Sequence, residues 1–276
     1  MKLTQDQIDQ YDRDGFVILR GLLTAAEVKA LQQDAEVLRT PARDHADANV
    51  YEKDGKTLRA AWAVEIDSDA CAMAMRMPRI FGPVRQLTEK DTYLYQSRLN
   101  YKQARTGDVF QWHQDYGSWV EDGVPGGGDR QMLSVLVMLD DTEHENGPLR
   151  FIPGSHKAGL ISSQYDTETT SYALHVVTDD DVERLSKDAG MVECTGPAGT
   201  VAIFSGLLVH GSQKNLSDRD RRNLYFAYNT CDMLPDPDFP RREHACPYIM
   251  SDETGPLDFV PDQSLIEIAN QRGLLA

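Results

Sequence analysis

The sequence predicts a mainly β fold with flanking helices packed on the outside, either an antiparallel barrel or a double-sheet jelly roll. Three observations lead to this prediction: helical patterns come first, many short strand candidates follow, and turn motifs separate those candidates. A chain of 276 residues is long enough to bury a full core. We therefore expect a single domain over residues 1–276, with the jelly-roll core at about residues 91–230 and an ordered or lid-like tail at residues 231–276.

Two capping boxes mark the first two helices. In residues 4–7 and 24–27 a threonine stands three positions before a glutamine or glutamate, so the two side chains can satisfy the free amides of a helix start. Gly15 ends the first helix, and the β-prone residues 16–19 separate it from the second. The apolar residues that share one face of the second helix are Val28, Leu31, Ala35 and Leu38.

The middle of the chain changes from helical to β-prone. Polar residues 40–49 predict a loop, Asp54-Gly55 predicts a hairpin turn, and residues 68–87 predict a further helical stretch. The strand candidates that follow are residues 93–101, 132–139, 149–152, 200–204 and 224–228. The turn motifs between them are Asp122-Gly123, Pro125-Gly126-Gly127-Gly128, Asn146-Gly147-Pro148 and Pro153-Gly154-Ser155.

The composition is that of a globular enzyme with an acidic surface. Hydrophobic residues make up 41% of the chain and charged residues 26%. The net charge of −16 argues against nucleic acids and anionic membranes as partners, because both attract basic surfaces. No apolar run approaches the roughly 20 residues of a membrane span. We therefore expect a small-molecule substrate, with no nucleic-acid and no membrane partner.

The N-terminus and the cysteines predict a cytoplasmic protein. The residues after Met1 become polar at once, so we expect no signal peptide. The cysteines are far apart and form no Cys-x-x-Cys pair, which is typical of reduced thiols. They are Cys71, Cys194, Cys231 and Cys246. We expect a cytoplasmic monomer or homodimer.

A His-x-Asp motif at His113 and Asp115 is the first candidate for a metal site. On an extended strand, residues i and i+2 point to the same face and can converge on one ion. Two histidines and one carboxylate suit Fe(II) and leave coordination positions open for substrate and dioxygen. His45 and Asp47 have the same spacing, but no strand would fix their geometry in the polar segment. We interpret that second motif as part of a surface loop.

Aromatic residues distinguish the surroundings of His113. Aromatic rings at a strand edge can keep solvent away from a metal site. A role in the hydrophobic core is the alternative interpretation of the same rings. They are Phe110, Trp112, Tyr116 and Trp119.

A third ligand must come from another part of the chain, and His210 is the candidate. It follows an apolar segment, where a polar side chain needs a partner; a histidine satisfied within the core is the alternative. Arg221 comes eleven residues later, and its guanidinium could grip a dicarboxylate with two hydrogen bonds. For one of the two residues Arg221 and Arg222, the alternative to a binding role is a solvent-exposed position at the start of a strand. His156 lies in a turn, so we assign it a structural role.

Five motifs occur in order along the chain: Trp112-His113-Gln114-Asp115, Asn146-Gly147-Pro148-Leu149, Ile152-Pro153-Gly154-Ser155-His156, His210-Gly211-Ser212 and Arg221. In this combination the chain resembles the phytanoyl-CoA dioxygenase family, and within it the ectoine hydroxylase and free-amino-acid hydroxylase branch. The resemblance runs from about Leu3 to Asn229. It implies a double-stranded β-helix, which is a cupin-like jelly roll, and chemistry that depends on Fe(II) and 2-oxoglutarate.

The resemblance also implies roles for individual residues. The iron ligands would be His113, Asp115 and His210, and the contacts of 2-oxoglutarate would be Arg221 at the distal carboxylate, Ser212 and Asn100. The positions that line the substrate pocket in ectoine hydroxylases fall on Gln96, Phe110, Trp119, Phe204, Asn223 and Tyr225. Aromatic rings together with two amides suit a small zwitterion or a cationic ring.

The chain departs from the strict ectoine hydroxylase pattern near the pocket. Those enzymes carry His-Ser-Asp-Phe-Glu-Thr-Trp-His where residues 113–120 read His-Gln-Asp-Tyr-Gly-Ser-Trp-Val. They also carry an N-terminal extension and a shorter loop in place of residues 125–129. We expect this glycine-rich loop to lie near the pocket mouth, where Gly126, Gly127 and Gly128 could form a lid. The identity of the substrate is therefore left open.

These observations predict an Fe(II)- and 2-oxoglutarate-dependent dioxygenase that uses O2 to hydroxylate an unactivated C–H bond, with release of succinate and CO2. The expected substrate is a small polar or zwitterionic molecule, either an ectoine-like compound or a free amino acid, and a larger natural-product intermediate is the alternative. No nucleophile motif occurs, so we expect no catalytic residue beyond the iron ligands. A metal-dependent hydrolase or isomerase, or a binding protein, on the same fold would be the other classes.

Overall fold

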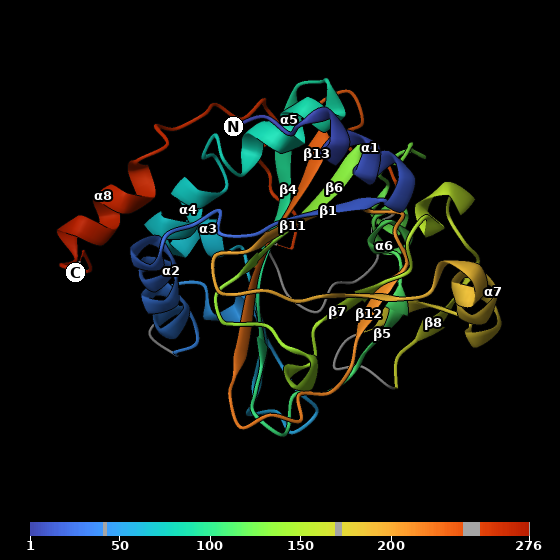
Figure 1. The fold of residues 1–276 in the computed structure, drawn as a ribbon, viewed down its shortest axis with the longest axis horizontal. Helices are drawn as coiled ribbons and strands as arrows, with labels where there is room; N and C mark the ends of the chain where they lie inside the picture. The colour runs from blue at the N-terminus through green and yellow to red at the C-terminus, as the bar shows by residue number, and fades with distance from the viewer. Residues whose placement is uncertain (41–42, 169–172, 240–248, 276) are drawn as a thin grey trace.

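Two antiparallel sheets form the centre of the protein in the computed structural model, which describes residues 1–40, 43–168, 173–239 and 249–275 (Figure 1). The major sheet has the strand order β1-β11-β6-β13-β4-β3-β2, and the minor sheet has the order β10-β7-β12-β5-β9-β8. Helices lie on the outer sides of both sheets. The mainly β fold with flanking helices is therefore as the sequence predicts.

The strands are short in the minor sheet and longer at the centre of the major sheet. Those of the major sheet are β1 (Phe16–Leu19), β2 (Asn49–Tyr51), β3 (Leu58–Trp62), β4 (Thr92–Lys102), β6 (Met132–Met138), β11 (Val201–Ser205) and β13 (Arg221–Thr230). Those of the minor sheet are β5 (Phe110–His113), β7 (Leu149–Phe151), β8 (Ser163–Asp166), β9 (Leu174–Val177), β10 (Val192–Cys194) and β12 (His210–Ser212).

The helices are mostly outside this strand region. They are α1 (Gln5–Asp14), α2 (Ala25–Leu38), α3 (Val64–Asp67), α4 (Asp69–Ala74), α5 (Phe81–Thr88), α6 (Asp115–Trp119), α7 (Asp179–Ala189) and α8 (Ser264–Gln271). Single 3-10 turns occur at η1 (Ala46–Ala48), η2 (Val120–Asp122), η3 (His144–Asn146) and η4 (Ser155–Ala158). None of the helices in the described ranges has the length and apolar character that crossing a membrane requires.

The two predicted capping boxes are confirmed. Thr4 and Thr24 each accept a hydrogen bond from the backbone amide three residues on, and the Gln or Glu at that position bonds back to the capping residue. Gly15 ends α1 in the left-handed region, with φ of 85°, which a residue with a Cβ adopts only at a cost. The prediction of one helical stretch over residues 68–87 is wrong, because α4 and α5 are separate helices with Pro78 between them.

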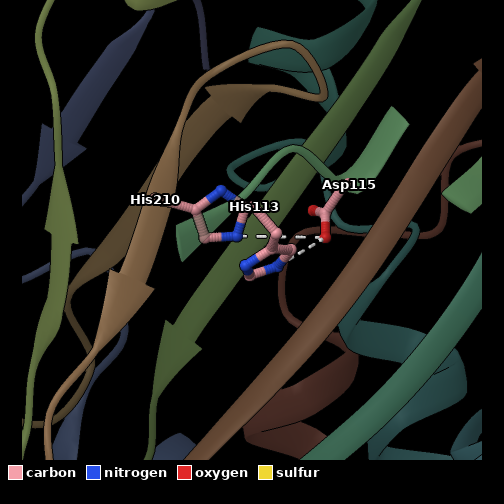
Figure 2. Close-up of side chains that lie close together, drawn as sticks. All are labelled: His113, Asp115 and His210. Carbon is pink, nitrogen blue, oxygen red and sulfur yellow. Dashed lines mark ion pairs between the residues drawn. The ribbon is translucent and has the colours of Figure 1, made fainter. Parts of the chain in front are cut away.

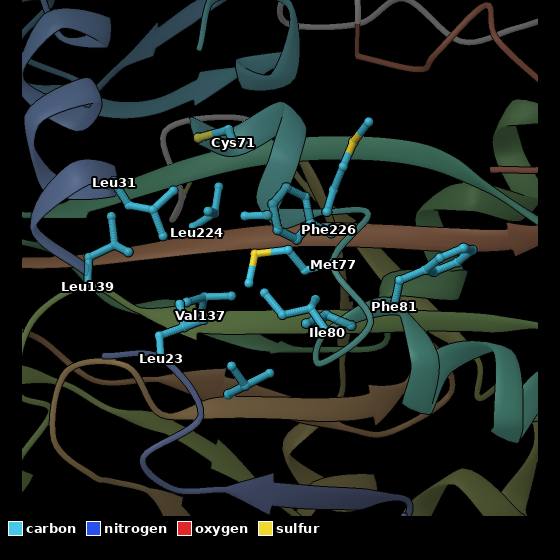
Figure 3. Packing of buried hydrophobic residues seen from close by; sticks show 14 of the residues in the cluster. Leu23, Leu31, Cys71, Met77, Ile80, Phe81, Val137, Leu139, Leu224 and Phe226 are labelled. Carbon is cyan, nitrogen blue, oxygen red and sulfur yellow. The ribbon is translucent and has the colours of Figure 1, made fainter. Parts of the chain in front are cut away.

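The largest hydrophobic cluster lies between the helices and the outer face of the major sheet (Figure 3). Leu31 of α2, together with Met77 and Ile80 from the segment before α5, packs against Val137 of β6 and Phe226 of β13. The helix α8 packs on α2 and α4 at the same side of the molecule (Figure 1). These contacts hold the far end of the predicted C-terminal tail against the helices.

Two smaller clusters fill the space between the sheets. One of them joins Phe16 and Phe204 of the major sheet to Phe151 of the minor sheet. The other gathers Tyr95 and Trp119 at the opposite end of the same space. On the outer side of the minor sheet, α7 covers the strands through a further apolar cluster. The metal-ligand candidates lie on β5, α6 and β12, between these layers.

Candidate metal centre and its cavity

Three predicted metal ligands come together between the sheets (Figure 2). His113 is the last residue of β5, Asp115 is the first residue of α6, and His210 is the first residue of β12. Strand pairing places His210 directly opposite His113 in the minor sheet. All three side chains are buried. The ligand atoms lie within 4.8 Å of one another, and within the described residues no other group of acidic, histidine or cysteine side chains is arranged in this way.

The expectation that His113 and Asp115 share one strand is only half correct. The strand β5 ends at His113, and Asp115 already belongs to the short helix α6. The residue between them, Gln114, keeps an extended backbone with φ of −112° and ψ of 130°. Because of this one extended residue, the two side chains still point to the same side.

The two imidazoles are oriented by carbonyl groups of their own chain segments. His113 Nδ1 donates to the carbonyl oxygen of Gln111 at 2.8 Å, and His210 Nδ1 donates to that of Leu208 at 2.9 Å. A carbonyl can only accept, so Nδ1 carries the proton in both rings. In a neutral ring of this tautomer Nε2 has a free lone pair, and the two Nε2 atoms lie 3.5 Å and 3.9 Å from Asp115 Oδ1.

The local charges favour metal binding over protonation. Burial, with a further contribution from His113, lowers the pKa of His210 to about 3, so this imidazole is neutral at neutral pH. Burial alone would raise the pKa of Asp115, but the two histidines and Arg98 outweigh it and hold that pKa below its usual range. Neutral imidazoles and an ionised carboxylate are the forms that a divalent metal requires. This donor set fits Fe(II).

Two further side chains hold the carboxylate of Asp115. Ser134 of β6 donates to Oδ2 at 2.6 Å, which leaves Oδ1 turned toward the two histidines. A guanidinium nitrogen of Arg98 lies 3.7 Å from Oδ1. The rings of Trp62 and Tyr225 hold the Arg98 guanidinium in place, with its carbon 5.2 Å and 4.8 Å from their centroids.

A cavity lies beside the metal-ligand candidates, along the inner face of β4 and β13. Both histidines of the candidate metal centre line it, together with the residues predicted to contact 2-oxoglutarate. Its walls are formed by Glu52, Arg59, Arg98, Asn100, Tyr101, Lys102, Asp108, Phe110, His113, Leu149, His210, Ser212, Arg221 and Tyr225. The predicted groups Arg221, Ser212 and Asn100 are thus in one place with the metal site.

Two buried cations face this cavity without a carboxylate partner. Arg221 and Lys102 are 3% and 7% exposed, and neither forms an ion pair with any carboxylate in the described ranges. Lys102 Nζ instead donates to Ser212 Oγ at 2.7 Å and to the carbonyl oxygen of Gln213. Burial, together with the charges of Arg221 and Arg59, lowers the pKa of Lys102 well below its usual value. Burial also lowers the pKa of Arg221.

Two buried polar atoms in the same cavity lack a hydrogen-bond partner within the described part of the chain. They are Asn100 Oδ1 and Arg221 Nε. Buried polar groups are nearly always hydrogen-bonded in folded proteins, and an exception needs an explanation. Uncompensated positive charge and unused hydrogen-bonding atoms in one cavity are features of a binding site for a small anion.

The residues predicted to line the substrate pocket lie in three different places. Phe110 and Tyr225 line the cavity beside Arg221, and the side-chain carbonyl of Asn223 accepts a hydrogen bond from the Arg221 guanidinium. Gln96 and Trp119 lie elsewhere and bond to each other, with Trp119 Nε1 donating to Gln96 Oε1 at 3.1 Å. Phe204 makes a third contact surface, since its ring centroid lies 5.0 Å from that of His210.

The other histidine motifs have the structural roles that were expected of them. His45 bonds to Asp67 at 2.6 Å, and Asp47 is exposed, so this His-x-Asp motif gathers no ligand set. His156 is 2% exposed and packs near Tyr11, with ring centroids 6.5 Å apart. Cys246 lies outside the described residues, whereas the cysteines that are described are free thiols.

Sequence reasoning missed three residues that the structure brings to the site. Arg98 and Lys102 lie on β4, two residues either side of the predicted Asn100. Alternation along a strand places residues i, i+2 and i+4 on one face, so this spacing was a usable signal. Ser134 was also missed, and its signal was a lone hydroxyl in the apolar strand β6.

The family model described as phytanoyl-CoA dioxygenase matches residues 11–223. An ectoine dioxygenase of Bordetella bronchiseptica is 33% identical over 255 residues, which are 88% of this chain and 82% of that protein. An L-proline trans-4-hydroxylase of Streptomyces griseoviridis is 32% identical over 237 residues, which are 82% of this chain and 86% of that protein.

Solved structures of EctD from S. alaskensis are also similar. The structure with 2-oxoglutarate and 5-hydroxyectoine is 31% identical, has a TM-score of 0.80, and covers 94% of this chain and 88% of its own. The structure with bound Fe has a TM-score of 0.78 at 30% identity, with the same coverage. The predicted family resemblance and the predicted jelly-roll class are both confirmed.

Proposed function

The chain belongs to the phytanoyl-CoA dioxygenase family, and from this premise we propose that His113, Asp115 and His210 hold Fe(II) while Arg221 and Lys102 hold 2-oxoglutarate. The protein is an Fe(II)- and 2-oxoglutarate-dependent dioxygenase that hydroxylates a small polar molecule. This function matches the expectation from the sequence and differs from the hydrolase, isomerase and binding-protein alternatives.

The pair of buried cations is the single observation that carries the assignment of 2-oxoglutarate to this cavity. Placing Arg221 and Lys102 side by side in a buried cavity costs free energy unless an anion neutralises them. A carboxylate that accepts from the guanidinium, from the lysine and from Ser212 would satisfy all three groups at once. His113 and His210 line the same cavity, so a short dicarboxylate held by the cations would lie beside the metal site.

The residues of the chain have distinct tasks in the proposed site. Bound Fe(II) supplies the activation of O2 that couples decarboxylation of 2-oxoglutarate to hydroxylation of a C–H bond. Ser134 keeps the Asp115 carboxylate turned toward the histidines, and the cavity cations hold the far carboxylate of the co-substrate. Phe204 and its apolar cluster exclude water from one side of the metal site.

We infer that the substrate lies on the side of Gln96 and Trp119. Arg221, Lys102 and Ser212 are already assigned to the co-substrate, whereas the pair formed by Gln96 and Trp119 presents an aromatic ring and an amide. The similar proteins named ectoine dioxygenase and L-proline trans-4-hydroxylase favour a compound of the size of ectoine or a free amino acid over a large intermediate.

A spectroscopic titration tests the cofactor assignment. Anaerobic addition of Fe(II) and then 2-oxoglutarate to the metal-free protein should produce a weak metal-to-ligand absorption band. The variant Asp115→Ala should not produce it. Folded wild-type protein that shows no band and consumes no 2-oxoglutarate would contradict the proposal.

A succinate-release screen tests the substrate class. The candidates are ectoine, L-proline and the other free amino acids, and substrate-dependent succinate release identifies the accepted compound. Release with none of these small zwitterions would favour a larger substrate. We further propose that the enzyme works in the cytoplasm, which agrees with the free thiols of Cys71, Cys194 and Cys231. Light scattering after size exclusion will distinguish a monomer from a homodimer.

A further inference from the structure

Gln114 stands between two metal-ligand candidates but faces away from them. His113 and Asp115 point into the site, and the extended backbone of Gln114 sends its side chain to the opposite side. The side chain is nevertheless 2% exposed. A buried amide needs hydrogen-bond partners, and those of Gln114 come from two distant segments.

The Gln114 amide forms three hydrogen bonds, all to backbone groups. Its Nε2 donates to the carbonyl oxygens of Leu207 at 2.6 Å and of Gly159 at 2.8 Å, while its Oε1 accepts from the amide of Ile161 at 2.8 Å. Leu207 lies in the turn between β11 and β12, three residues before His210. One side chain therefore connects the segment of His113 and Asp115 to the turn that carries the third ligand.

Few other hydrogen bonds connect the segment of His113 and Asp115 to the turn before His210. The strands β5 and β12 pair directly at His113 and His210, and the register then shifts before the next pair. Asp115 lies beyond the end of β5, so no strand pairing holds it. The amide of Tyr116 donates to the carbonyl oxygen of Gly206 at 3.0 Å, which is the neighbouring link to the same turn. Without the Gln114 amide, that backbone bond and the pairing of His113 with His210 would be the remaining links to this turn, while Ser134 and Arg98 hold the Asp115 carboxylate from the major sheet.

We propose that Gln114 is a positioning residue that holds the segment of His113 and Asp115 against the turn before His210, so that the three ligands are arranged before the metal binds. An apolar side chain of the same size would leave the carbonyl of Leu207 and the amide of Ile161 buried and unsatisfied, and would remove the partner of the Gly159 carbonyl. The segments would then separate to hydrate these groups, and binding of the metal would have to restore the geometry. This inference rests on the proposed iron site.

Metal affinity of the metal-free protein is the measurement that tests the role of Gln114. Titration with Co(II) in the absence of 2-oxoglutarate gives a dissociation constant and the Co(II) absorption spectrum. We expect Gln114→Met to bind Co(II) about 10- to 100-fold more weakly than wild type, as is typical when a group that orients metal ligands is removed. Gln114→Glu keeps the size of the side chain and the oxygen that accepts from Ile161, but it loses the donor to Leu207 and Gly159. It should therefore also bind Co(II) more weakly than wild type, and it serves as the test variant if Gln114→Met does not fold.

Gln32→Met is the matched control. Gln32 of α2 also donates to a backbone carbonyl, that of Leu139 at 2.6 Å, but it lies on the helix side of the major sheet. This variant should lose stability in thermal unfolding and keep the wild-type affinity for Co(II). Wild-type affinity in the folded Gln114 variants would overturn the inference, and so would an equal loss of affinity in Gln32→Met. Failure of the wild-type protein to bind Co(II) would instead overturn the proposed iron site.

Discussion

Replacement of Lys102 by methionine should change stability and co-substrate binding in opposite directions. Lys102 is 7% exposed, and its neighbours in the cavity include the cations Arg221 and Arg59. Lys102→Met keeps the length of the side chain and removes the charge. The ligand-free protein loses an unfavourable interaction, whereas the complex with 2-oxoglutarate loses a favourable one.

The bonds of Lys102 set the expected magnitudes. Apolar replacement of a buried ion pair or triad stabilises proteins by up to about 1–4 kcal/mol, and for the single charge of Lys102, which also donates to Ser212, we expect the lower half of this range. A gain of about 1–2 kcal/mol corresponds to a rise in Tm of about 2–8 °C. The complex loses a hydrogen bond from a charged group, about 1.5–3 kcal/mol. Affinity for 2-oxoglutarate should therefore fall by about 10- to 100-fold.

The effect of pH follows from the lowered pKa of Lys102. Burial, Arg221 and Arg59 lower this pKa in the folded protein, so above it the folded state binds fewer protons than the unfolded state. The ligand-free enzyme should gain stability as the pH rises from the folded pKa toward the ordinary lysine range. Binding of 2-oxoglutarate favours the charged lysine, so affinity should fall over the same range. Both trends should be weaker in Lys102→Met.

Thermal unfolding and calorimetric titration with 2-oxoglutarate, both with Mn(II) in place of Fe(II), measure the two effects. Lys90→Met is the matched control, because Lys90 is a half-exposed lysine that pairs with Asp232 at 2.7 Å on the surface. This control should leave the affinity for 2-oxoglutarate unchanged. A lower Tm for ligand-free Lys102→Met, together with wild-type affinity, would refute the reasoning.

Three further substitutions test the metal site and the substrate side. Asp115→Ala should abolish substrate-dependent succinate release and His45→Ala should leave it intact; the reverse result would mean that the wrong His-x-Asp motif had been assigned. Ser134→Ala removes the 2.6 Å hydrogen bond to Asp115 and should weaken Co(II) binding about tenfold. Equal Co(II) affinities of this variant and the wild type would contradict the role given to Ser134. Gly206→Ala would place a Cβ 2.6 Å from the Trp119 ring and force that ring to move. It should therefore raise the KM for substrate by about tenfold or more, while the affinity for 2-oxoglutarate stays constant. An unchanged KM would show that Trp119 does not take part in substrate binding.

Local rules were sufficient for much of the fold. The capping boxes at Thr4 and Thr24 depend only on residues three positions apart, and the helices begin where those residues predict. The hairpin predicted at Asp54-Gly55 joins β2 and β3, and Asp54 accepts from the amides of Lys56 and Thr57 there. Such features need no information from the rest of the chain, so a sequence contains them in full.

The geometry of the site depended on longer-range contacts. The end of β5 at His113 could not be predicted, because its partner strand β12 begins only at His210, directly opposite, and no local signal in β5 marks that point. The cavity role of Lys102 required strand alternation to be followed beyond Asn100, and its proximity to Arg221 arises from the pairing of β4 with β13. Pairing between segments far apart in the chain is the information that local patterns lack.

The strand β13 carries cavity-lining residues on one face and hydrophobic core residues on the other. Arg221, Asn223 and Tyr225 belong to the cavity side, whereas Leu224 and Phe226 belong to the hydrophobic cluster under the helices. Substitutions on the first face can therefore alter what the enzyme accepts without disturbing the packing on the second. An enzyme built in this way can diverge in specificity through single changes and keep its fold. In directed evolution, libraries restricted to the alternate inward positions of β13 and β4 should yield folded variants more often than libraries of neighbouring positions.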